Sequence, residues 1–68
     1  MKLYFENSRG QRRLIGEPVD DDAAWKMIHE FCSERNFHIH YVRTWMVESS
    51  GETCFDVGSH TEFFYLAK

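Results

Sequence analysis

Only one stretch of the sequence repeats its apolar residues with the period of a helix, and this limits the folds open to the chain. Over residues 21–36, a helix would gather one apolar arc on its surface. The arc consists of Ala24, Trp25, Met27, Ile28, Phe31 and Cys32. Aspartates at positions 20–22 suit the N-cap and the positive end of the helix dipole. Arg35 and Asn36 suit the last turn and the C-terminal cap. We therefore predict one helix over about residues 21–36.

The segment before this helix predicts a hairpin. Residues 2–7 and 11–17 are candidate strands, joined by a turn at residues 8–10 where Gly10 can supply a positive φ. Leu3 and Phe5 share one face of the first strand. Leu14 and Ile15 form the apolar centre of the second.

Three more strands are predicted after the helix. Over residues 37–47, apolar side chains alternate with a period of two, which is typical of a half-buried strand. The alternating positions are Phe37, Ile39, Tyr41, Trp45 and Val47. Arg43 interrupts them, as a bulge or a rim position. Residues 53–57 and 62–67 are two further strands, with turns at residues 49–52 and 58–61.

The resulting order, strand-strand-helix-strand-strand-strand, predicts an α+β fold. We expect an antiparallel sheet of four to five strands with the helix packed on one face. The 68 residues leave room for one core, so residues 1–68 form a single predicted domain. Aromatic residues make up 16% of the chain, which gives so short a chain the means to fill that core.

One helix covers only one face of a sheet, so the other face is left for water or a partner. The positions that alternate with the half-buried series place His40, Val42 and Met46 on that face, where Tyr4 would join them. Trp25 lies at the rim of the helical arc. We predict that these five residues bind a protein, either a host or phage protein or a second copy of the chain.

Two histidines raise the question of a metal. His38 and His40 would lie on the same side of one strand, about 6.5–7 Å apart. Cys54 and Asp56 from a neighbouring strand have suitable ligand chemistry. Because two ligands at a spacing of two arise easily by chance, we expect solvent-facing histidines and no metal site. We also expect no cofactor and no catalytic site.

Nucleic-acid binding is the alternative function. Arg9, Arg12 and Arg13 cluster on the first hairpin, and Arg43 could join them across the sheet to bind single-stranded nucleic acid beside aromatic side chains. The net charge of −3 argues against a general binder of phosphate backbones. The arginines also have a structural explanation, since charges keep an edge strand soluble.

The composition also suggests a compartment. Cys32 and Cys54 are too few for a disulfide scaffold, and the first residues lack a signal-peptide pattern. The longest apolar run, residues 63–67, is far shorter than the roughly 20 residues that span a bilayer. We expect a cytoplasmic protein with no membrane partner.

Three strings carry a resemblance: MKLYFENS at residues 1–8, AWKMIHEF at 24–31 and DVGSHTEFFY at 56–65. They resemble small uncharacterised proteins encoded by phages and prophages of Gram-positive bacteria, over nearly the whole chain. None of the strings is a motif with a known mechanism, so no catalytic residue is carried over. The resemblance implies an accessory protein in a bacterial cytoplasm that binds a host or defence protein, or nucleic acid.

Overall fold

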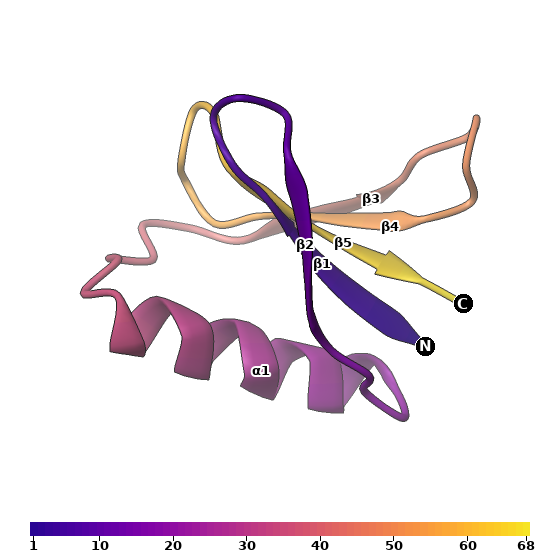
Figure 1. Cartoon of the computed structure of the whole chain (residues 1–68), viewed down its shortest axis with the longest axis horizontal. Helices are drawn as coiled ribbons and strands as arrows, with labels where there is room; N and C mark the ends of the chain where they lie inside the picture. Colours follow the sequence, from indigo (N-terminus) through magenta and orange to yellow (C-terminus); the bar gives the residue numbers. More distant parts are fainter.

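Two strands before the helix and three after it combine into one antiparallel sheet in a computed structural model that describes all 68 residues (Figure 1). In chain order the elements are β1 (Lys2–Glu6), β2 (Arg12–Gly16), α1 (Asp21–Glu34), β3 (Arg43–Met46), β4 (Thr53–Asp56) and β5 (Phe63–Ala67). The strands lie side by side in the order β2-β1-β5-β4-β3. This arrangement confirms the predicted α+β class, with the helix on one face of the sheet.

The ends of α1 follow from its capping residues. Asp20 is extended, and its carboxylate accepts a hydrogen bond of 2.8 Å from the backbone N–H of Ala23. At the other end, Asn36 adopts a φ of 55°, and the N–H of Phe37 donates to the carbonyl of Cys32 at 2.8 Å. The positive φ of Asn36 and this hydrogen bond are the features of a Schellman motif, which ends the helix and turns the chain back toward the sheet.

The core lies between α1 and the sheet. Ala24, Ile28 and Cys32 are the buried residues of the helix, as the apolar arc predicted. The sheet side contributes Leu3, Phe55, Val57, Phe64 and Leu66. Phe31 packs edge-on against Phe64, with ring centroids 5.6 Å apart. Such contacts add to the burial of apolar surface that stabilises so small a domain.

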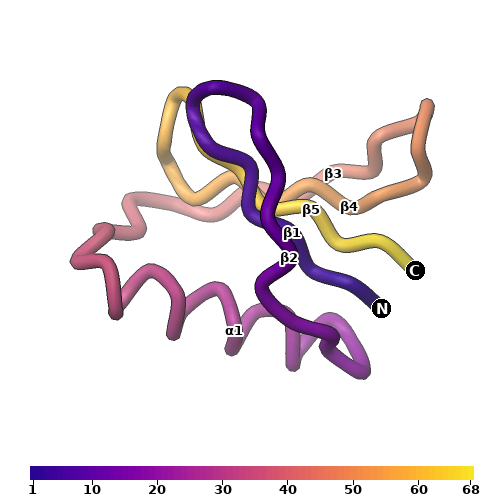
Figure 2. The backbone as a smooth tube through the Cα atoms, in the orientation of Figure 1, coloured from indigo at the N-terminus to yellow at the C-terminus, as the bar shows by residue number.

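The three predicted turns between neighbouring strands are present. In the β1–β2 turn, the side-chain oxygen of Asn7 accepts hydrogen bonds from the N–H groups of Arg9 and Gln11. The β3–β4 turn is a four-residue loop closed by the N–H of Val47, which donates to the carbonyl of Glu52 at 2.8 Å. Figure 2 shows the β1–β2 and β4–β5 loops on the side of the molecule where α1 ends, whereas the β3–β4 turn projects on the side where α1 begins.

The third predicted strand is wrong over its first half. Residues 37–42 form no strand, and β3 is only four residues long. Phe37 and Ile39 do pack against the core, but as part of a connection from the helix to the sheet edge. The alternation of apolar side chains predicted over residues 37–47 therefore does not extend into β3. Tyr41 and Trp45, predicted as half-buried, are 46% and 44% exposed.

The helix is also too short to cross a membrane. It has 14 residues, and neither its length nor its apolar content matches a bilayer-spanning segment.

Candidate functional site

The sheet face turned away from α1 carries a row of side chains that crosses all five strands. Each residue of the row lies opposite the next, in the order Leu14, Tyr4, Tyr65, Cys54 and Trp45. Leu14 and Trp45, at the two ends, are 47% and 44% exposed, whereas Cys54 in the row is only 1% exposed. This face is therefore covered in its middle and open at its two edges.

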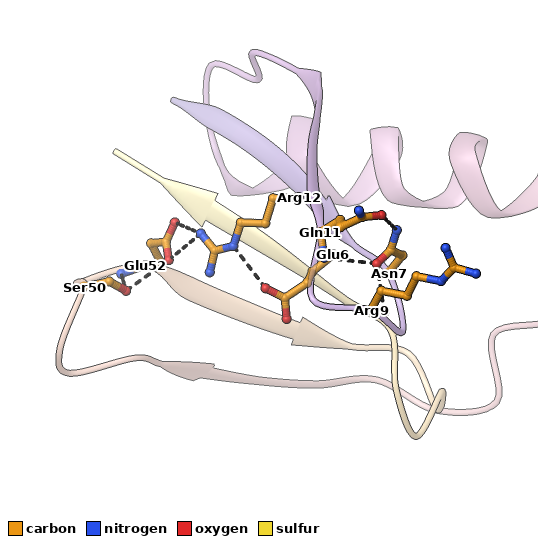
Figure 3. Close-up of polar contacts among 7 residues, drawn as sticks. All are labelled: Glu6, Asn7, Arg9, Gln11, Arg12, Ser50 and Glu52. Atoms are coloured by element: carbon orange, nitrogen blue, oxygen red, sulfur yellow. Dashed lines mark hydrogen bonds and ion pairs between the residues drawn. The ribbon is translucent and has the colours of Figure 1, made fainter.

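Arg12 covers one part of this face (Figure 3). Its guanidinium lies 4.1 Å from the centroid of the Tyr65 ring and pairs with two carboxylates, Glu6 at 3.2 Å and Glu52 at 2.7 Å. Ser50 donates a further hydrogen bond to Glu52 at 3.0 Å. The hydrogen bond from Arg12 is the main reason why the pKa of Glu52 lies below its ordinary value, although burial opposes the shift.

Arg43 covers the part of this face that lies over β3 and β4. It lies opposite Asp56 in register and donates to its carboxylate at 2.9 Å, while Asp56 itself is only 3% exposed. Burial raises the pKa of Asp56, but the hydrogen bonds from the Gly58 N–H and from Arg43 more than compensate, so the pKa is lowered. Both buried carboxylates of this face are thus satisfied by arginines.

The two thiols lie in protected places. Cys32 is in the core and Cys54 lies under the open face, and burial raises the pKa of each. A raised pKa keeps a thiol protonated at neutral pH and lowers its nucleophilicity. These positions suit packing.

Exposed apolar side chains gather instead at the outer edge of β3. Tyr41, Val42, Trp45 and Met46 are 46%, 46%, 44% and 62% exposed. They lie within residues 41–46, which we call the β3 edge. No other strand of the sheet flanks β3 on this side.

The backbone of this edge is also free to pair. The closing pair of the hairpin, Val47 and Glu52, is hydrogen-bonded. Hydrogen-bonded pairs alternate along an antiparallel ladder, so the polar backbone groups of Arg43 and Trp45 point to β4. Those of Thr44 and Met46 therefore point outward, where another strand could pair with them.

The residues predicted to bind protein do not share one surface. Tyr4 lies half-buried on the open face, as predicted. Met46 lies opposite Thr53, which lies opposite the core residue Leu66, so its predicted place on the open face is wrong. Val42 belongs to the β3 edge, at a position outside any strand.

The other two residues lie apart from that edge. His40 lies in the irregular connection, beside Gly58. Trp25 packs edge-on against Phe55 at 5.1 Å, on the helix side. Tyr41 and Trp45 were missed because the period of two assigned them to the half-buried series.

The four arginines of the predicted nucleic-acid surface do not form one patch. Arg12 and Arg43 lie on strands at opposite edges of the sheet, and each is paired with a carboxylate. Arg13 lies opposite Phe5, on the side of the helix, and Arg9 lies in the β1–β2 turn. Arg12 and Arg13 still line one hollow, but Arg12 is neutralised by its carboxylates, and Arg9 and Arg43 lie outside that hollow.

The candidate metal ligands are not brought together. The rings of His38 and His40 are close, with centroids 4.8 Å apart. Cys54 lies under the open face and Asp56 binds Arg43, and no three such side chains form a group that could hold a metal ion.

Comparison with known proteins adds no relative: no family model, no curated protein and no solved structure matches the chain. The functional argument therefore depends on the geometry of this molecule alone.

Proposed function

We propose that this chain is a non-enzymatic binding protein that acts by contact between its β3 edge and a partner protein. One observation carries the proposal. Four of the seven exposed large hydrophobic residues of the chain fall within the six residues of the β3 edge. Exposed apolar side chains concentrated on an unpaired strand are typical of a binding surface.

The mode of contact that fits is the addition of a partner strand to the sheet. The outward N–H and C=O groups of Thr44 and Met46 would pair with an extended segment of the partner. Side chains on alternate sides of the strand would provide specificity, with Trp45 on the open face and Met46 on the helix side.

The resemblance to phage and prophage proteins suggests what the partner is. The partner would be a host protein in the bacterial cytoplasm, such as a component of an anti-phage defence system. This chain would inhibit that protein by pairing with one of its extended segments. A phage protein or a second copy of this chain would use the same edge.

Nucleic acid is the weaker alternative because only two of the four arginines, Arg12 and Arg13, line a common hollow. The pairs Arg12–Glu52 and Arg43–Asp56 would have to break before either guanidinium could hold a phosphate. Breaking them would leave the buried carboxylate of Glu52 with only the Ser50 hydroxyl, and that of Asp56 with only the Gly58 N–H, which is costly.

The test uses proline to remove one backbone donor. Thr44→Pro deletes an N–H that points outward, which an edge strand tolerates. Leu14→Pro is the matched control, because Leu14 occupies the equivalent non-hydrogen-bonded position of the β2 edge. Both variants are first checked for retained folding by circular dichroism.

Partners are captured from nuclease-treated host lysate, identified by mass spectrometry, purified and titrated. We expect Thr44→Pro to weaken binding by at least about tenfold and Leu14→Pro to leave it unchanged. Equal effects of the two variants would contradict the proposed edge. Loss of capture after nuclease treatment would favour nucleic acid instead, and a concentration-dependent dimer in sedimentation would identify the partner as a second copy.

A further inference from the structure

A recess lies at the C-terminal end of α1, away from the β3 edge. It is a cavity of about 190 Å³ between the end of the helix and the adjoining ends of the sheet. Its floor consists of the buried residues Cys32, Val57 and Phe64. The half-buried rings of Phe5, Phe31 and Phe37 form its walls. The Schellman motif positions Phe37, because its N–H is the one that bonds to Cys32.

The mouth of the recess is polar. A second hollow of about 370 Å³ shares Phe5, Arg35 and Glu62 with the first. Its other lining residues are Asn7, Gln11, Arg12 and Arg13. The two hollows therefore adjoin, and together they are apolar at depth and hydrogen-bonding at the surface. This combination is the usual anatomy of a small-molecule site.

Two side chains of opposite charge line both hollows and are not used elsewhere. Arg35 lies over the ring of Phe31, with its guanidinium carbon 4.4 Å from the centroid, and it forms no ion pair. Glu62 also forms no ion pair, and its backbone N–H is held by the hydroxyl of Ser59 at 3.1 Å. Each charge is thus positioned at the mouth without a partner.

We propose that this recess binds an apolar α-amino acid of the size of phenylalanine or leucine. The cavity is somewhat larger than one of about 150 Å³ that accommodates benzene, so it fits one ring or one branched chain. Arg35 would hold the α-carboxylate through paired N–H donors, with Arg13 adding positive charge nearby. Glu62 would accept from the α-ammonium group. The inference is independent of the β3 edge.

The first test separates the three parts of the ligand. Purified protein is titrated with L-phenylalanine, 3-phenylpropionate, phenethylamine and L-alanine, and binding is followed by calorimetry and by amide chemical shifts. We expect saturable binding of phenylalanine with shifts at Cys32, Val57 and Glu62. Each analogue that lacks one charge, or the ring, should bind at least about tenfold more weakly. Absence of binding up to millimolar phenylalanine, or equal binding of a one-charge analogue, overturns the proposal.

The second test assigns each charge to one residue. Arg35→Gln should abolish the preference for phenylalanine over phenethylamine, and Glu62→Gln should abolish its preference over 3-phenylpropionate. Arg9→Gln and Glu48→Gln are matched controls, since both residues are exposed and line neither hollow. Because the readout is a ratio of affinities, a small loss of stability in a variant does not obscure it. Unchanged preferences in both variants overturn the assignment.

Discussion

The two outer strands of the sheet differ in how they meet solvent. β2 carries two arginines in succession, Arg12 toward the open face and Arg13 toward the helix side. β3 carries a single arginine, Arg43, which is paired with Asp56. Arg12 is also paired with carboxylates, so Arg13 is the arginine of the two outer strands that forms no ion pair. Charges on an edge strand discourage pairing with other chains, whereas a short apolar edge permits it. The chain therefore protects one edge by charge and leaves the other open to a partner.

The helix strengthens this difference. β2 is the strand that α1 approaches most closely. Gly16, at its end, lies so near the helix that an added Cβ would come within 2.5 Å of the sulfur of Met27. The β3 edge, in contrast, keeps its four large apolar side chains exposed. We infer that stability is concentrated on the covered side and binding on the uncovered side.

The largest expected effect is in the covered core. Ile28 is fully buried on the helix, so Ile28→Ala should lower the free energy of unfolding by about 2–5 kcal/mol. Val42→Ala, at the β3 edge, should change it by less than about 0.5 kcal/mol. Urea denaturation followed by tryptophan fluorescence measures both. Similar losses at the two positions would mean that the β3 edge belongs to the stabilising core.

A second substitution adds volume at each edge. Gly16→Val should cost about 1 kcal/mol, because its side chain would push aside the flexible sulfur end of Met27. Thr44→Val places the same side chain on β3, where a β-branched residue is favoured and space is open, so stability should stay the same or rise slightly. Equal costs would show that the helix does not constrain β2 more than β3.

The helix and the β1–β2 hairpin could be predicted from the sequence because local interactions determine them. Asp20 caps the helix within three residues, and the Asn36 turn that ends it needs only its neighbours. Asn7 forms the hairpin turn with residues at most four positions away. Interactions of this range leave a direct signature in residue type and spacing.

The β3 edge and the recess depend on contacts that spacing does not encode. β1 pairs with β5, so β3 becomes an outer strand only when the two ends of the chain meet. The alternation over residues 37–42 reflects an extended connection packed on the core, and periodicity alone cannot distinguish it from a strand. Arg35 and Glu62 gave no signal, because their common role depends on long-range packing.

The ion pairs near the two edges should respond differently to acid. The folded pKa values of Glu52 and Asp56 are lowered, so their stabilisation is complete above the unfolded values of about 4 and is lost as the pH falls through the folded values. Arg12→Met should cost about 1 kcal/mol at pH 7, because Glu52 loses its main partner in a partly solvent-screened pair. This difference from the parent should shrink as the pH falls below about 4 and then through the lowered pKa of Glu52 in the parent, because Glu52 is then protonated in both proteins.

Arg43→Met is the matched change at the other edge. Asp56 keeps the hydrogen bond from the Gly58 N–H, which lowers its pKa more than the hydrogen bond from Arg43 does. The effect of Arg43→Met should therefore be smaller, and should vary less with pH, than that of Arg12→Met. Urea denaturation at a series of pH values measures both effects. A larger loss of stability in Arg43→Met would mean that Arg43, and not the Gly58 N–H, is the main partner of Asp56.

The smallest effect on stability should accompany the largest effect on binding. Met46 is 62% exposed on the β3 edge, so Met46→Lys should change the free energy of unfolding by less than about 0.5 kcal/mol. The lysine should nevertheless weaken binding to the purified partner, because an ammonium group at the edge would have to be desolvated when a second strand pairs there. Calorimetric titration measures the affinity, and urea denaturation measures the stability.

Leu14→Lys is the control that decides whether this result is specific to the β3 edge. Leu14 is an exposed apolar residue of the other outer strand, with an exposed fraction of 47%, and the added charge is the same. If an added lysine weakens binding only when it lies on the β3 edge, Leu14→Lys should leave partner affinity unchanged. Weakening by both lysines to the same extent would mean that net charge governs the contact, because the net charge of −3 is made less negative by one in each variant. Weakening by Leu14→Lys alone would move the binding surface to β2.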